Sequence, residues 1–171
     1  MPISLAPFVP SNEAVVTRML ELAQVTSDDV VADLGCGDGR ILISAVQKFG
    51  AKSAIGYELR ADLYKTVTSK IQKENLSDQI QVFNEDALKA DLTDATIITL
   101  YLTTSGNSKL KPLLSQLKDG TRIVSHDFRM DGWTYSKREN FQGHTIYLYN
   151  IPESLKQQTN LRSKFPFRRR Y

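Results

Sequence analysis

The stretch that decides the fold runs from residue 31 to residue 41 and reads Val31-Ala32-Asp33-Leu34-Gly35-Cys36-Gly37-Asp38-Gly39-Arg40-Ile41. Its apolar first part predicts a buried β-strand, and the apolar spacing that begins at Ile41 predicts a helix that closes at Gly50. Between the two, alternating glycines let the backbone turn sharply and approach a ligand closely. Because the helix also presents free N–H groups at its N-terminus, we expect a ligand site at this loop.

The spacing of the glycines argues against a nicotinamide or flavin nucleotide site. Such sites use Gly-x-Gly-x-x-Gly, whereas the glycines at positions 35, 37 and 39 give a pattern one residue shorter. Asp33 stands just before these glycines, and a carboxylate there repels a pyrophosphate but suits a cationic ligand. S-adenosylmethionine (SAM) carries an ammonium and a sulfonium group, so charge complementarity favours SAM.

Two further acids follow later predicted strands. Glu58 ends the segment 53–58, where a carboxylate can accept hydrogen bonds from both hydroxyls of a ribose. Asp86 follows the segment 80–83, where a carboxylate can accept from an adenine amino group. Acids at three successive strand ends, one of them beside the glycine loop, therefore predict one SAM site.

The rest of the chain alternates between helical and strand periods. Ser11 is a candidate N-cap for the first helix, and Pro112 is expected to kink or restart a later one. Strands are expected at residues 30–34, 53–58, 80–83, 96–102, 121–125 and 144–149. Five strand–helix alternations predict an α/β fold, with a doubly wound, mostly parallel sheet that ends in an antiparallel hairpin.

Length and composition are those of one globular domain, with 171 residues, 41% of them hydrophobic and 24% charged. The sequence has no apolar run of the ~18 residues that a membrane helix needs. The N-terminus does not look like a signal peptide, so we expect a cytoplasmic protein. The lone Cys36 and the two histidines, His126 and His144, predict neither a disulfide nor a metal site.

Charge is distributed unevenly along the chain. Residues 152–171 carry six basic side chains and one acidic one, while the other 151 residues carry 16 basic and 18 acidic ones. We therefore expect a domain over residues 1–151 and a basic, flexible tail over residues 152–171. Such a tail is typical of segments that bind an anionic partner, either nucleic acid or a membrane surface, and equally of an end that only aids solubility.

The glycine motif, from Asp33 to Arg40, resembles the first motif of class I SAM-dependent methyltransferases. More narrowly, the chain is similar to the small archaeal protein-lysine methyltransferases. It is also similar to their mitochondrial relatives, which modify the adenine nucleotide translocase and the ATP synthase c-subunit. The narrower resemblance covers about residues 7–151 and rests on Pro7-Phe8-Val9-Pro10-Ser11, Leu110-Lys111-Pro112, residues 120–128, Gly132-Trp133 and residues 144–149.

The resemblance implies a Rossmann-like, seven-stranded sheet and a site that binds SAM, releases S-adenosylhomocysteine and uses no metal. It also implies that residues 7–11 cross the cofactor pocket near the methyl donor. The family commonly has Tyr where this chain has Phe8, and Thr-Pro where it has Ser11-Asn12. The residues implied to hold the cofactor are Asp33, Gly35, Cys36, Gly37, Gly39, Glu58, Leu59, Asp86, Ala87 and Tyr101.

The acceptor implied by the resemblance is an exposed lysine of a protein substrate. Methyl transfer from a sulfonium is an in-line displacement, so the lysine must arrive neutral although its free pKa is about 10.4. An apolar, aromatic mouth disfavours the ammonium form and so supplies the neutral amine. The candidate residues of this mouth are Phe8, Tyr101, His126, Asp127 and Trp133.

Two other functions remain open at this point. The Asp/Asn-Pro-Pro-Tyr tetrapeptide of adenine methyltransferases is absent after the fourth predicted strand, where the chain reads Leu100-Tyr101-Leu102-Thr103-Thr104-Ser105. This disfavours a nucleic-acid base as the acceptor without excluding other RNA chemistry. The chain also has no room for the substrate-covering insertion of small-molecule methyltransferases, so we expect an open site. The alternatives are an RNA or small-molecule methyltransferase of the same fold, and a SAM-binding module without catalysis.

Overall fold

The computed structural model describes residues 4–155, and the rest of the expected basic tail lies outside them. Its elements follow in the order α1 (Glu13–Leu22), β1 (Val30–Leu34), α2 (Arg40–Gln47), β2 (Ser53–Tyr57), α3 (Ala61–Lys73), β3 (Ile80–Phe83), the 3-10 turn η1 (Ala87–Lys89), β4 (Ile97–Leu100), α4 (Thr104–Leu114), β5 (Arg122–His126), β6 (Lys137–Phe141) and β7 (His144–Asn150). The predicted alternation of strands and helices is confirmed. None of the helices in this part of the chain has the length and apolarity needed to cross a membrane.

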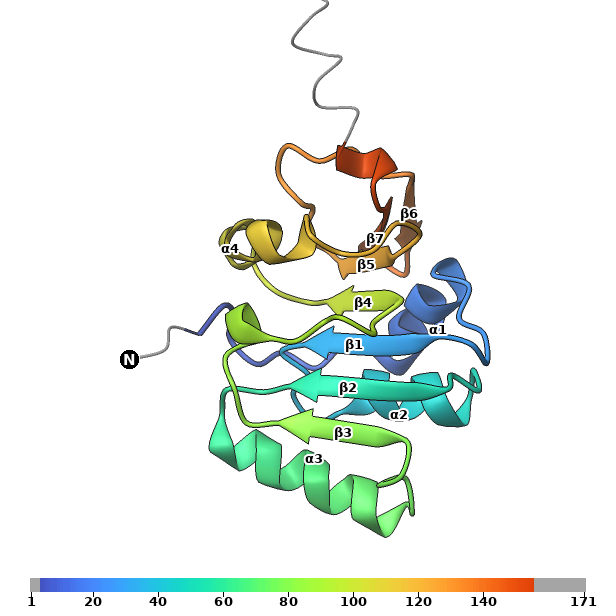
Figure 1. Cartoon of the computed structure of the whole chain (residues 1–171), viewed down its shortest axis with the longest axis vertical. Coiled ribbons are helices and arrows are strands. Elements are labelled where there is room, and N and C mark those ends of the chain that lie inside the picture. The colour runs from blue at the N-terminus through green and yellow to red at the C-terminus, as the bar shows by residue number, and fades with distance from the viewer. Residues whose placement is uncertain (1–3, 156–171) are drawn as a thin grey trace, which may run out of the picture.

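The seven strands form one sheet in the order β3-β2-β1-β4-β5-β7-β6. Strands β1 to β5 run parallel, whereas β7 is antiparallel to β5 and forms an antiparallel hairpin with β6. Figure 1 shows the arrowheads of the parallel strands at one edge, where the N-terminal segment also passes. The strand order reverses between β1 and β4, and ligands of open α/β sheets bind at the carboxyl ends of strands at such a switch point. The predicted fold is therefore confirmed.

Two apolar layers cover the faces of the sheet. Helices α1, α2 and α3 contribute to one layer, in which Met19 and Leu42 are fully buried. Helix α4 and the segment around η1 contribute to the other, in which Leu110 is fully buried. Neighbouring residues of β1 alternate between the layers, Val31 in the first and Ala32 in the second, as the period of a strand requires.

Two local expectations are corrected. The N-cap of α1 is Asn12 rather than Ser11, and its side chain accepts the N–H of Ala14 at 2.8 Å. Helix α4 continues through Pro112 instead of restarting there. Just past the expected domain boundary at residue 151, Ser154 is buried and its hydroxyl accepts the backbone N–H of Asn150 at 3.1 Å.

Candidate active site

A pocket opens at the carboxyl ends of β1, β2 and β4. Its walls come from residues 4–11, residues 35–38 of the glycine loop, residues 57–60 after β2, residues 85–87 after β3, and residues 101–102 after β4. The pocket therefore has the position that the strand order predicts for the ligand.

Asp33 forms the acidic floor of this pocket. It lies near the end of β1, only 3% exposed, and one of its oxygens accepts a hydrogen bond from the Thr99 hydroxyl at 2.7 Å. Burial, with a smaller contribution from the nearby charges of Glu58 and Asp38, raises the pKa of Asp33 to about 7, and the hydrogen bond from Thr99 opposes this rise. A cation bound beside Asp33 would stabilise its ionised form.

Glu58 fixes the glycine loop against the end of β2. One oxygen of its carboxylate accepts the backbone N–H of Gly37 at 2.9 Å, and the other accepts the N–H of Arg60 at 2.8 Å. An ionised carboxylate has about four lone-pair sites. Backbone contacts therefore set the orientation of the Glu58 carboxylate toward the pocket. The carboxylate still has lone pairs that can accept hydrogen bonds from the two hydroxyls of a ribose, as predicted from the sequence.

The two later glycines of the loop have different roles. Gly37 has a φ of +54° and lines the pocket, and a Cβ placed on it would lie 2.5 Å from the ring of Phe8. Gly39 has a φ of +77° at the start of α2 and does not line the pocket. A Cβ on Gly39 would collide with the side chain of Val67 in α3. The structure thus gives Gly39 a packing role in place of the expected cofactor contact.

The remaining predicted cofactor residues border the pocket. Asp86 caps the η1 turn, because its side chain accepts the N–H of Leu88 at 3.0 Å, and the buried Ala87 follows it. Cys36 also borders the pocket, but its sulfur points to the backbone of Gly56 in the core. Burial raises the pKa of the Cys36 thiol far above its usual range, so this side chain is no nucleophile. Gly35, Leu59 and Tyr101 line the pocket as predicted.

Residues 4–11, which we call the N-terminal strap, form one complete wall of the pocket. The hydroxyl of Thr103 donates to the carbonyl of Leu5 at 3.0 Å, and the guanidinium of Arg40 donates to the carbonyl of Ser11 at 2.6 Å. Arg40 is itself held by a two-point ion pair with Asp38. This role of Arg40 was not predicted, because an arginine at the start of a helix is usually only a solvated charge.

The expected acceptor mouth is only partly assembled at the pocket. Phe8 and Tyr101 line it, whereas the buried His126 lies behind Tyr101, with the two rings stacked 3.8 Å apart. Trp133 packs edge-on against Tyr149, 6.3 Å between ring centres, in the second apolar layer and away from the pocket. Burial raises the pKa of Tyr101, as does the nearby charge of Asp127, so its phenol stays neutral at pH 7.

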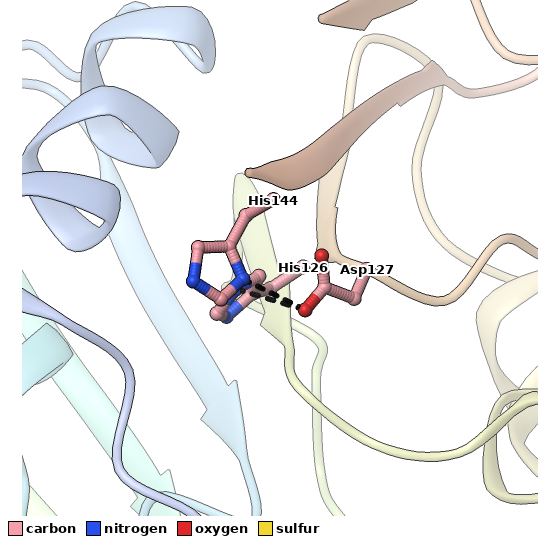
Figure 2. A group of neighbouring side chains, drawn as sticks. All are labelled: His126, Asp127 and His144. Atoms are coloured by element: carbon pink, nitrogen blue, oxygen red, sulfur yellow. Dashed lines mark hydrogen bonds and ion pairs between the residues drawn. The ribbon is translucent and has the colours of Figure 1, made fainter. Parts of the chain in front are cut away.

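Asp127 is likewise turned away from the pocket and joins a cluster with His126 and His144. Figure 2 shows the two imidazole rings and the carboxylate converging from the end of β5 and the start of β7. The Nε2 atom of His126 faces His144 in this cluster. Its other ring nitrogen, Nδ1, lies 2.9 Å from the hydroxyl of Ser11 in the strap. Burial lowers the pKa of His126 well below its usual value, so this ring is neutral at pH 7.

The strand order and the acid-floored pocket beside a glycine loop define a class I SAM-dependent methyltransferase. The chain belongs to the family described as the ANTKMT methyltransferase domain, whose model matches residues 33–137. The fold, the class of enzyme and the family resemblance expected from the sequence are thereby confirmed.

Relatives and solved structures agree with this assignment. The chain is 41% identical over 152 residues to a protein-lysine N-methyltransferase of Saccharolobus islandicus, which covers 86% of this chain and 94% of the relative. It is 30% identical over 128 residues to the adenine nucleotide translocase lysine N-methyltransferase of Mus musculus, covering 74% of this chain and 55% of the relative. It also superimposes, with a TM-score of 0.82 and 43% identity, on an RNA methyltransferase from Salinibacter ruber in complex with S-adenosyl-L-homocysteine. The match covers 85% of this chain and 95% of the other chain.

Proposed function

We propose that the protein transfers the methyl group of SAM to lysine side chains of protein substrates. The observation that carries the proposal is the pairing of the acidic floor at Asp33 with an aromatic wall at Phe8 and Tyr101 in one pocket. The relative from Saccharolobus islandicus, named as a protein-lysine N-methyltransferase, supports the choice of acceptor at 41% identity over 94% of its length.

The described residues fit a cationic, nucleoside-containing donor. In the proposed binding mode Asp33 accepts from the donor's ammonium group, Glu58 from its ribose, and Asp86 from its adenine. When bound, SAM supplies an activated methyl group on sulfur. The protein contributes alignment, and the strap limits access of water to the pocket from one side.

The mouth favours a neutral amine. Phe8 and Tyr101 present apolar rings, and the phenol of Tyr101 remains uncharged because its pKa is raised by burial and by Asp127. A lysine that enters between such rings loses hydration, which disfavours its ammonium form. The incoming amine therefore reaches the methyl group as a nucleophile without a dedicated base, and the proton that it carries after methylation is released to water.

RNA methylation is the second candidate function. It is favoured by the Salinibacter ruber structure, which is named as an RNA methyltransferase and shares 43% identity over 95% of its chain. The two functions differ in the molecule that becomes labelled, so one experiment separates them.

The test is methyl transfer from radiolabelled SAM into a cell extract that contains both protein and RNA. We expect label that resists ribonuclease, disappears with protease and yields methyl-lysine after acid hydrolysis. The variant Asp33→Asn should abolish labelling, while Asp131→Asn, a matched change at an exposed acid outside the pocket, should leave it unchanged. Label that disappears with ribonuclease would establish the RNA function instead.

A further inference from the structure

Three potential metal ligands converge behind Tyr101. Nε2 of His126 lies 3.0 Å from Nδ1 of His144, and that nitrogen lies 2.9 Å from Oδ2 of Asp127. The third side of the triangle, from His126 Nε2 to Asp127 Oδ2, measures 3.4 Å. Figure 2 shows the three side chains close together, with dashed lines between them, near the end of β5 and the start of β7.

The dimensions of this triangle match those of a metal site. Zinc binds imidazole nitrogen and carboxylate oxygen at about 2.0–2.2 Å. Ligand atoms on such bonds lie about 3.3–3.5 Å apart in tetrahedral geometry and about 2.9–3.1 Å apart at right angles. The observed sides of 2.9, 3.0 and 3.4 Å span these values, so the spacing of the three atoms is compatible with their binding one ion.

The outward-facing atoms of two of the ligands are held in place by the protein. The Nδ1 atom of His126 lies 2.9 Å from the hydroxyl of Ser11, and Oδ1 of Asp127 accepts the N–H of Thr145 at 2.9 Å. With its proton on Nδ1 and donated to Ser11, His126 presents a bare Nε2 to the cluster. Outer contacts of this kind orient the histidine and carboxylate ligands of metal sites.

Hydrogen bonds within the cluster leave one acceptor without a well-placed donor when the proton of His126 is on Nδ1. With that tautomer of His126, its Nε2 atom and the Oδ2 atom of Asp127 are both acceptors, and both face the single Nδ1 atom of His144. One proton on that nitrogen cannot serve both acceptors with good geometry. Asp127 moreover has a φ of +60°, a backbone conformation rare outside glycine, which places its carboxylate at the cluster. A cation at the centre would satisfy all three atoms.

We propose that His126, Asp127 and His144 bind one divalent transition-metal ion, with Zn²⁺ as the occupant that the donor set favours. Two histidines and one carboxylate are a recurrent ligand set for such ions. The side chain of His144 is 36% exposed and that of Asp127 29%, so the ion can enter from solvent and keep a further position for water.

The metal would act as a clamp rather than as a participant in methyl transfer. It would join the end of β5 to the start of β7 and fix His126, on which Tyr101 stacks. Because His126 also contacts Ser11, the same clamp would hold the end of the strap. The proposal therefore predicts that metal binding stabilises the fold and orders the wall of the pocket.

The test is a titration of the chelator-treated, full-length protein with Co²⁺, followed by its visible d–d absorption and then by displacement with Zn²⁺. We expect saturation at one ion per chain. Asp127→Asn and His144→Asn should each weaken binding by at least about tenfold. Asp131→Asn, an exposed acid in an ion pair with Arg129, should bind like the wild type.

A second measurement needs no variant. The chain contains two histidines, so in protein labelled at histidine the ring signals of His126 and His144 should both shift with one equivalent of Zn²⁺. Thermal unfolding should move to higher temperature over the same titration. Failure of the wild type to saturate, unchanged histidine signals, or equal affinity in folded Asp127→Asn and His144→Asn proteins would overturn the proposal.

Discussion

The buried carboxyl group of Asp33 makes binding of the cofactor depend on pH. Its pKa is raised to about 7 by burial, so the free protein holds Asp33 largely neutral below that pH. A cationic ligand requires the ionised form, so a proton must leave when SAM binds below pH 7. We expect the affinity for SAM to fall about tenfold per pH unit below 7, because a proton must be released from Asp33 on binding. Calorimetric titrations between pH 5.5 and 8.5 measure this.

Asp33→Asn provides the control, because asparagine can still accept the hydrogen bond from Thr99. The variant should bind SAM weakly and without the pH dependence.

The stability of the free protein should also depend on Asp33, since folding disfavours the ionised form of this carboxyl group. Wild-type stability should fall as the pH rises from the ordinary carboxyl pKa to about 7, whereas the variant should lack this loss and melt higher at pH 8. A variant that melts lower at pH 8 would contradict the buried-charge explanation.

Gly37 tests the contact between the loop and the strap. Gly37→Ala imposes a left-handed residue with a side chain, which costs about 1–2 kcal/mol, and pushes its methyl group into the ring of Phe8. Gly50→Ala carries the same type of backbone penalty, because its φ is +68°, but meets no atom within 4 Å. We expect both variants to lose stability, and only Gly37→Ala to lose SAM affinity by an order of magnitude or more in calorimetry. Equal SAM affinities in the two variants would show that the ring of Phe8 moves aside without cost to ligand binding.

At this scale the sequence predicted most of the cofactor pocket. Asp33 and Glu58 were found because strand ends and glycines are local signals, and both line the pocket. Ser11 was misassigned as a helix cap because the next residue, Asn12, is an equally good cap and holds that position. Gly39 and Trp133 do not line the pocket, because they pack against Val67 and Tyr149, which come from distant parts of the chain.

Among the elements, the strap is held to the rest of the domain by side-chain hydrogen bonds from Thr103 and Arg40 to its carbonyl groups. Arg40→Ala removes the 2.6 Å hydrogen bond to the carbonyl of Ser11 and the ion pair with Asp38. We expect faster amide hydrogen exchange in residues 5–11 and a SAM affinity lowered about tenfold, because a bond to a charged group contributes about 1.5–3 kcal/mol. Arg129→Ala, which removes an exposed ion pair outside the pocket, is the matched control. If hydrogen exchange in the strap were unchanged in Arg40→Ala, contacts other than those of Arg40 would hold the strap in place.

Helices and strands were predictable because their periods are local. The hairpin partner of β7 was expected only in outline, since β6 carries the sequence Lys137–Phe141, in which no residue is fully buried. An edge strand of this kind lacks the apolar alternation that identifies a strand. Its position follows instead from pairing with β7, where Phe141 lies opposite His144.

For the whole molecule, the boundary between domain and tail can be located by truncation. Among the described residues, those that line the pocket lie between positions 4 and 102, so we expect removal of residues 156–171 to leave SAM affinity unchanged. Removal of residues 152–171 should lower the melting temperature, because it deletes the buried Ser154 and its bonds to Asn150 and Thr134. Comparing the melting curves of the two truncated proteins checks this. Equal melting temperatures would place the boundary at residue 151 after all.

Long-range assembly also explains why the sequence did not predict the cluster of His126, Asp127 and His144. His126 and His144 are 18 residues apart and belong to different strands, and neither has a spacing typical of metal ligands. The antiparallel register of β5 and β7, in which His126 lies opposite Ile146, brings the two rings together. Such a cluster depends on strand pairing in the folded protein, so local sequence patterns do not predict it.

The inward-pointing sulfur of Cys36 gives the protein an internal reporter. It is the sole thiol in the chain, it is 5% exposed, and it belongs to the glycine loop that borders the pocket. An alkylating reagent can reach it only when that loop opens, and a ligand that binds the closed form slows this opening by a factor of one plus its concentration over Kd. The rate of a single mass addition per chain therefore measures SAM occupancy directly, before any methyl acceptor is known.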